Sequence, residues 1–136
     1  MDESAGKIED LNARIIELAM AQKCCAQIVM AIGLEKLNKT SPELIQAMRA
    51  ACYGFHGNNL CGTLVAGSCL LSLCHEYYSI VLIPELFQWF KEKYGRLNCL
   101  DIVGGVDRDP TQCINLMAET YCQCFDLLKK YGVELE

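Results

Sequence analysis

The stretch that decides the fold reads Phe55-His-Gly-Asn-Asn-Leu-Cys61-Gly-Thr-Leu-Val-Ala-Gly-Ser-Cys69-Leu-Leu-Ser-Leu-Cys74. No residue from Gly57 to Cys74 is charged, and a glycine- and asparagine-rich beginning runs into Leu, Val, Ala and Cys. This composition predicts a loop followed by a helix that is buried on all sides. Cys61 is expected at the first position of that helix, where backbone N–H groups and the helix dipole favour a thiolate. Cys61 is therefore the first candidate catalytic residue.

Length and charge narrow the class of protein. The chain has 136 residues, of which 52% are hydrophobic and 21% charged, so we expect a single helical domain over residues 1–136 with a packed core. A net charge of -5 without a run of Lys or Arg argues against nucleic acid and anionic membrane as partners. The acidic, polar beginning resembles no secretory signal, so a cytoplasmic location is expected.

The region before the central stretch predicts two helices. Apolar residues recur at spacings of three and four, which indicates one long amphipathic helix from about Ser4 to Leu37, with Gly33 as a point of interruption. The sequence Thr40-Ser-Pro-Glu43 then offers an N-cap, a proline in the first turn and a capping glutamate, and the second helix is expected to run to about Cys52.

The region after the central helix predicts two or three more. A fourth helix spans Pro84 to Tyr94, and Ser79–Ile83 could instead form a short strand, although no second strand offers itself for pairing. Asn98 caps a short segment, Cys99–Val103, and Asp109-Pro110 opens a last helix that runs to about residue 130. The fold class is therefore all-α, a single-domain bundle of five or six helices around a buried central helix.

Ten cysteines are the strongest compositional signal. A cytoplasmic cysteine cluster is more often metal-binding or catalytic than a disulfide scaffold, although most of the ten are expected to be small buried hydrophobes. Cys61, Cys99 and Cys113 fall at or near predicted helix starts, where negative sulfur is stabilised. Cys25 is expected in the middle of the first helix, on its inward apolar face, where the other three could meet it.

The order of these residues also carries a family resemblance. A Cys-Ala-Gln in the first helix, a glycine-rich loop before Cys61-Gly62, then Asn98-Cys99 and Cys113 resemble the C-GCAxxG-C-C family of putative redox-active proteins over essentially the whole chain. The resemblance implies four functional cysteines, which map onto Cys25, Cys61, Cys99 and Cys113. This chain has Thr63 and Ala66 where that motif has Ala and Gly, so the central turn is expected to pack less closely.

A similar domain occurs in split-Soret cytochromes, where it is associated with an iron-sulfur centre. This chain has no Cys-x-x-Cys-His for covalent haem, so haem is not expected, and without a dinucleotide or phosphate-loop motif neither is a nucleotide cofactor.

Three functions follow as alternatives. In the first, which is preferred, the four cysteines bind a [2Fe-2S] cluster or another thiophilic metal and pass electrons to an unknown redox partner protein. The absence of any Cys-x-x-Cys pair separates this site from ferredoxin and zinc-ribbon patterns. In the second, pairs of the four exchange thiols and disulfides, with Cys61 as the attacking thiolate. In the third, the chain is a non-catalytic helical interaction module with buried cysteines, and a homodimer is compatible with the sequence.

Other residues near these positions have simpler interpretations. Cys24 is adjacent to Cys25 but points elsewhere on a helix, so it is expected to pack in the core or lie at the surface. Cys124 is expected in the core. His56 could replace a sulfur ligand or donate a proton, and His75 is expected to end the central helix.

Overall fold

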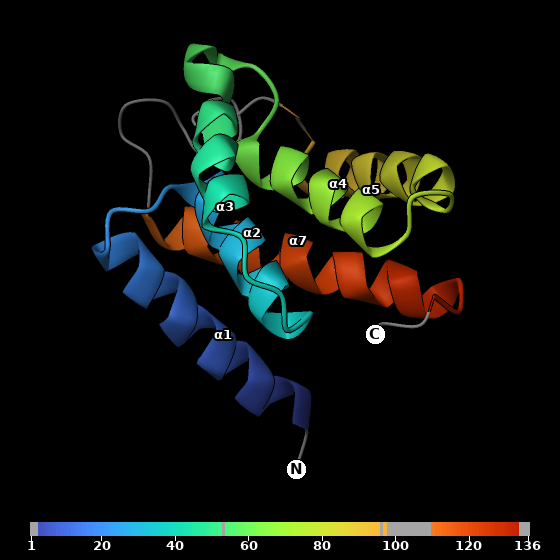
Figure 1. The fold of residues 1–136 in the computed structure, drawn as a ribbon, viewed down its shortest axis with the longest axis horizontal. Helices are drawn as coiled ribbons and strands as arrows, with labels where there is room; N and C mark the ends of the chain where they lie inside the picture. Colours follow the sequence, from blue (N-terminus) through green and yellow to red (C-terminus); the bar gives the residue numbers. More distant parts are fainter. Residues whose placement is uncertain (1–2, 53, 96, 98–109, 134–136) are drawn as a thin grey trace.

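The described part of the chain is all-α, with helices joined by turns and loops, as the sequence predicts. The computed structural model describes all residues except 1–2, 53, 96, 98–109 and 134–136. The α-helices of the described residues, labelled in Figure 1, are α1 (Glu3–Met20), α2 (Cys25–Lys36), α3 (Pro42–Met48), α4 (Gly62–Cys74), α5 (Ser79–Tyr94) and α7 (Pro110–Lys130). Two short helical turns, η1 (Arg49–Ala51) and η2 (Gly54–Asn58), connect α3 to α4.

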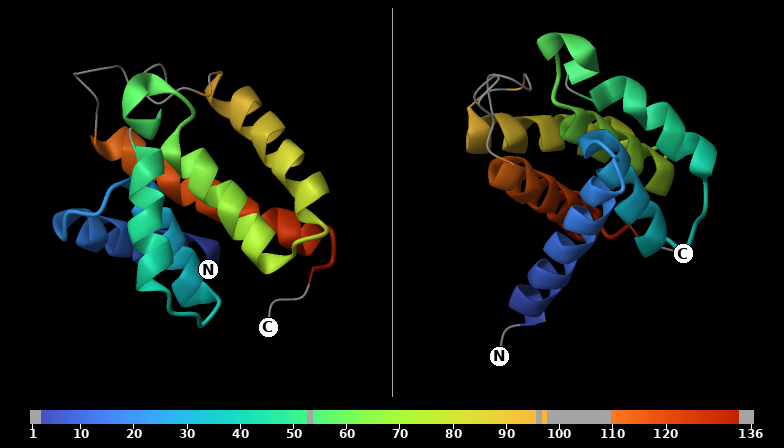
Figure 2. Two further views of the ribbon diagram at one scale, coloured as in Figure 1. Left: turned by 45° about the horizontal axis from the view of Figure 1, so that its top comes forward. Right: turned by 90° about the vertical axis from the view of Figure 1, so that its left-hand side faces the viewer.

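The central helix α4 is the element around which the others pack. It contacts α2, α5 and α7, and Figure 2 shows it crossing between them. Leu64, Leu70 and Leu71 are almost completely buried, but Leu73 in its last turn is 41% exposed, so the helix is not buried on all sides as the sequence predicts. In the turn that departs from the motif, Thr63 and Ala66 are both buried. The expectation that this turn packs less closely than one with the motif's Ala and Gly stays a prediction.

The first predicted helix is in fact two helices. Gln22 adopts a left-handed conformation with φ of 68°, and Cys24 is extended before α2 begins. This turn reverses the chain, so α1 lies against α2 and α7 along the outside of the bundle (Figures 1 and 2). Gly33, the expected interruption, lies inside α2, where a Cβ atom would overlap the Leu70 side chain of α4. The apolar spacing cannot separate one long helix from two, because both helices bury the same kind of stripe.

The remaining helices begin and end near the predicted residues, except at the end of α3 and at the start of α5. Ser41 caps α3 by accepting a hydrogen bond from the Leu44 N–H at 3.3 Å, but α3 ends at Met48 and tightens into η1 instead of reaching Cys52. Helix α5 begins five residues before Pro84, so the segment that could have been a strand is helical. The bounds of α7 agree with the prediction, whereas the predicted segment Cys99–Val103 lies outside the described residues.

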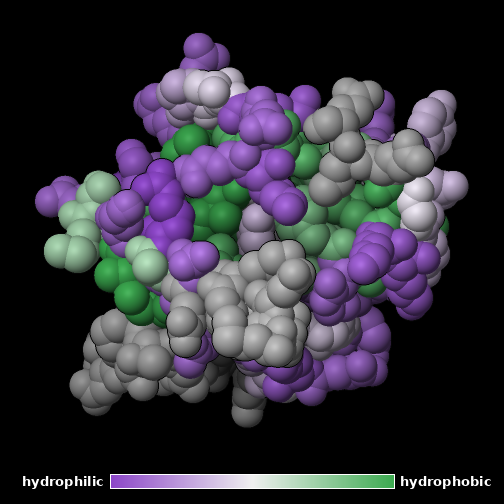
Figure 3. All heavy atoms as spheres, turned by 90° about the horizontal axis from the view of Figure 1, so that it is seen from below, coloured by the Kyte–Doolittle hydropathy of each residue, from purple (hydrophilic) through white to green (hydrophobic). Residues whose placement is uncertain are grey.

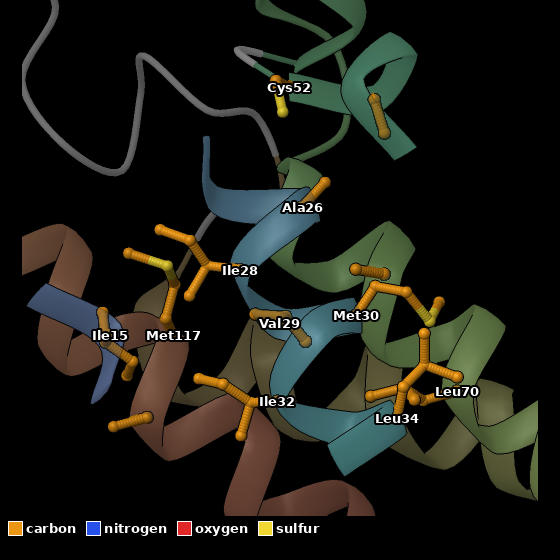
Figure 4. Close-up of a cluster of buried hydrophobic side chains, with 13 residues drawn as sticks. Ile15, Ala26, Ile28, Val29, Met30, Ile32, Leu34, Cys52, Leu70 and Met117 are labelled. Carbon is orange, nitrogen blue, oxygen red and sulfur yellow. The ribbon is translucent and has the colours of Figure 1, made fainter. Parts of the chain in front are cut away.

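Two groups of buried side chains form the core. The first lies among α1, α2, α4 and α7 and is shown in Figure 4, where Ile28 of α2 and Met117 of α7 point toward each other. The second fills the space among α4, α5 and α7 and includes Leu82, Leu86 and Phe90. On the face shown in Figure 3, polar side chains surround an area of apolar ones. Within the described residues, no helix combines the length and the hydrophobicity needed to cross a bilayer.

Candidate redox site

Cys61 occupies the amino end of α4, one residue before the first helical position. Its carbonyl accepts the first helical hydrogen bond, from the Val65 N–H at 3.1 Å, and its own N–H donates to the Leu97 carbonyl at 2.8 Å. Only 4% of Cys61 is exposed. The sulfur is therefore carried at the positive end of a buried helix, which confirms the predicted position to within one residue.

Cys25 reaches the same end of α4 from a different helix. A Cβ atom added to Gly62 would lie 2.9 Å from the Cys25 Sγ and 2.7 Å from the Ala51 carbonyl oxygen, closer than packed atoms allow. Glycine at position 62 therefore permits α2 and η1 to approach the first turn of α4. The Cys25 sulfur is thereby placed beside the residue that follows Cys61.

The position of Cys25 within its helix differs from the expectation. It was expected in the middle of a long helix but is the first residue of α2. The break before α2 was not visible in the apolar spacing, and it gives Cys25 a helix-start position like that of Cys61.

Cys113 lies in the first turn of α7, as predicted, and is half-buried. It packs against the same core group as Cys25. Ile28 and Met117, which follow the two cysteines by about one turn, point toward each other in Figure 4. The fourth cysteine, Cys99, lies outside the described residues.

The expectation for Cys24 is also wrong. It was expected to pack in the core or lie at the surface, but it forms a disulfide with Cys52, across a Cα–Cα distance of 6.1 Å that is ordinary for such a bond. Cys24 is half-buried and Cys52 is completely buried. The two adjacent cysteines do point to different places, because the Cys25 sulfur lies against Gly62. No feature of the sequence pairs residue 24 with residue 52, which lies on a different helical segment.

The cysteines outside this region have the properties of core residues. Burial raises the pKa of Cys69, Cys74, Cys122 and Cys124, which opposes formation of a thiolate. Cys124 is completely buried, with its Sγ 3.6 Å from the Gly67 carbonyl oxygen, so its predicted place in the core is confirmed.

The two histidines bond to nearby backbone atoms. The exposed His56 ring places Nε2 3.0 Å from the Arg49 carbonyl oxygen, so this nitrogen acts as the donor. His75 ends α4, as predicted, and its Nδ1 accepts a hydrogen bond from the Tyr78 N–H.

Sequence reasoning missed a polar group near Cys61. The Tyr94 hydroxyl donates to Glu119 Oε1 at 2.9 Å, and Lys93 Nζ lies 3.0 Å from Glu119 Oε2. Burial and the bond to Glu119 raise the pKa of Tyr94, and a negative charge on Cys61 acts in the same direction. From the sequence, Tyr94 was only the end of a helix.

The described residues do not form a metal site by themselves. No three His, Cys, Asp or Glu side chains in the described ranges gather closely enough to hold an ion. Cys25, Cys61 and Cys113 all lie within those ranges, so these three do not form such a group by themselves, and the fourth cysteine of the set, Cys99, lies outside the ranges.

Comparisons with known proteins agree with the cysteine pattern. No curated protein and no solved structure gives a match. A family model described as "Putative redox-active protein (C_GCAxxG_C_C)" matches residues 23–127, which begin just before Cys24 and end within α7. With most of its length matched, the chain belongs to this family.

Proposed function

We propose that this protein transfers electrons through a centre held by Cys25, Cys61, Cys99 and Cys113, with a [2Fe-2S] cluster or another thiophilic metal bound to the four sulfurs. When bound, a cluster of this kind accepts and releases one electron. The chain would supply soft thiolate ligands from separate helices.

The observation that carries the proposal is the burial of Cys61. A thiolate that exchanges with a disulfide must be approached by another sulfur, and the 4% exposure of Cys61 leaves little room for that approach. Electron transfer needs no atom to reach the sulfur. The position of Cys61 therefore favours electron transfer over thiol exchange at this residue.

The chemistry and the helix positions of these cysteines support soft-metal ligation. Cys25, Cys61 and Cys113 each lie within a first helical turn or at the residue before it, where the dipole favours the deprotonated sulfur that a metal requires. The Cys25 sulfur lies against Gly62, the residue that follows Cys61. The remaining ligand would come from Cys99.

Thiol–disulfide exchange is the second candidate. It is favoured by the close approach of the Cys25 sulfur to the residue after Cys61, and by the disulfide between Cys24 and Cys52, because sulfurs in this part of the protein do form a bond. In this case Cys61 would attack only after the packing around it had opened.

Spectroscopy of protein purified without oxygen separates the two. Iron and zinc content, visible absorption, and electron paramagnetic resonance before and after dithionite should be measured for wild type, Cys113→Ser and Cys122→Ser. The two variants are matched, because both cysteines are half-buried residues of α7. We expect metal and signal in wild type and Cys122→Ser, and their loss in Cys113→Ser. Metal-free wild type after reconstitution with iron and sulfide would contradict the proposal, and an oxidation-dependent loss of thiols would then favour the second candidate.

A further inference from the structure

The disulfide between Cys24 and Cys52 lies outside the four-cysteine set of the proposed centre. We propose that it is a second redox site, a dithiol/disulfide pair that a dithiol protein reduces, and that its reduction loosens the packing around the amino end of α4.

Both halves of the disulfide are covalently joined to the groups that touch Gly62. Cys24 precedes Cys25, whose Sγ would lie 2.9 Å from a Cβ atom at position 62. Cys52 follows Ala51, whose carbonyl oxygen would lie 2.7 Å from the same atom. The bond therefore ties together the two segments, the start of α2 and the end of η1, that hold the first turn of α4.

The segment that follows Cys52 is held in an unfavourable conformation. Phe55 and His56 both have positive φ, 57° and 61°, which residues with side chains adopt only when the surrounding structure imposes it. This segment leads directly to Cys61. Breaking the bond at Cys52 would remove one of the constraints on it and allow the backbone to relax.

The two sulfurs differ in their access to a partner. Cys52 is completely buried, whereas Cys24 is half-buried, so an incoming sulfur can reach only Cys24. The Arg49 guanidinium donates to Gln27 Oε1 at 3.3 Å, and this same oxygen lies 3.4 Å from the Cys24 Sγ. Lys23 is exposed next to Cys24. These two cations favour the approach of a thiolate to Cys24.

The exchange is balanced without any other reagent. A thiolate of the partner attacks the Cys24 Sγ, the bond to Cys52 breaks, and Cys52 leaves as a thiolate that takes up a proton. The Met48 carbonyl oxygen, 3.8 Å from the Cys52 sulfur, can accept the hydrogen of the new thiol. The second thiol of the partner, once deprotonated, then attacks the partner's own sulfur in the mixed disulfide and releases Cys24. The partner becomes a disulfide, and Cys24 and Cys52 have gained two electrons and two protons.

The thiol exchange at Cys24 does not depend on the proposed function. Only its consequence for the proposed centre, through the packing around Cys61, rests on that function. The Cys24–Cys52 bond lies one residue from Cys25 and one residue from Ala51, and these two residues pack on Gly62. The burial of Cys61 would therefore depend on whether this bond is oxidised or reduced. The second site would thereby control access to the first.

The test combines thiol labelling with amide hydrogen exchange. Wild type is treated with thioredoxin, its reductase and NADPH, and Cys24 and Cys52 are quantified by differential alkylation and mass spectrometry. We expect both to become labelled, and the amides of residues 61–65 to exchange roughly tenfold faster. Persistence of the bond under this treatment, or reduction with unchanged exchange at residues 61–65, would overturn the proposal.

Two variants assign the effect to this bond. The double variant Cys24→Ala/Cys52→Ala should exchange rapidly at residues 61–65 without reductant and respond no further to it. The control Cys69→Ala/Cys122→Ala removes two half-buried sulfurs but keeps the bond, so it should respond as wild type does. A response in the first double variant equal to that of wild type would contradict the assignment. If this variant does not fold, thiol labelling and hydrogen exchange of reduced wild type still test the proposal. Neither readout needs a bound metal, so failure of the proposed function would be seen separately, in the metal content.

Discussion

Replacing Gly62 by alanine tests the close approach at the amino end of α4. The new methyl group would lie 2.7 Å from the Ala51 carbonyl oxygen and 2.9 Å from the Cys25 Sγ. One contact is with the backbone and the other with a short side chain at a helix start, so neither atom can swing away. Overpacking of this kind costs about 1–3 kcal/mol, whereas alanine gains up to about 1 kcal/mol from helix propensity. We expect a net loss of up to about 3 kcal/mol, and of about 2 kcal/mol at most if the full propensity gain is realised, together with a lower metal content.

Urea unfolding followed by circular dichroism gives this free energy directly. The matched control is Gly57→Ala, in which Asn59 Nδ2, at an ordinary 3.5 Å, is the one atom of the described residues that the new Cβ meets, so little change is expected. A Gly62→Ala protein with wild-type stability, an unchanged m-value and full metal content would show that α2 and η1 do not hold the first turn of α4 in the way described.

Three further predictions concern single side chains. Cys99→Ser should remove the bound metal or the redox-active disulfide, whereas Cys69→Ser should change only the stability, by about 1–3 kcal/mol. Metal analysis and thermal unfolding compare the two variants, and an equal metal content would contradict the proposed ligand set. In reduced, metal-free protein, the alkylation rate of Cys61 should reach its plateau at a lower pH than the alkylation rate of Cys124. Both residues are buried, but only Cys61 lies at a helix start. A plateau at a higher pH for Cys61 would refute this prediction. Burial raises the pKa of Tyr121 to about 12, above its ordinary value of 10, so the stability this group contributes is complete below pH 10 and lost as the pH rises to about 12. Tyr121→Phe should therefore lose less stability than wild type over that range in urea titrations, and parallel curves would contradict the assignment.

The helical architecture could be predicted because local signals coincide with it. The apolar run in α4 and the capping residues of α3 and α7 each specify a helix by short-range chemistry. The turn at Gln22 could not be predicted, because its left-handed conformation has no glycine to mark it. The boundary at Met48 depends similarly on packing between segments.

The candidate site was only partly predictable for the same reason. The helix-start argument named Cys61, Cys99 and Cys113 from local sequence, and the apolar spacing named Cys25, whose helix-start position is set by an unrecognised chain reversal. The bond from Cys24 to Cys52 depends on how α2 and η1 pack, which the spacing of cysteines in one sequence does not specify.

Native mass spectrometry of protein purified without oxygen tests the central claim most directly. The account predicts one metal centre on each chain, visible as added mass that Cys69→Ser retains and that Cys25→Ser, Cys61→Ser, Cys99→Ser and Cys113→Ser all lose. The account is contradicted if wild type, after anaerobic reconstitution with iron and sulfide, carries only the mass of the bare chain.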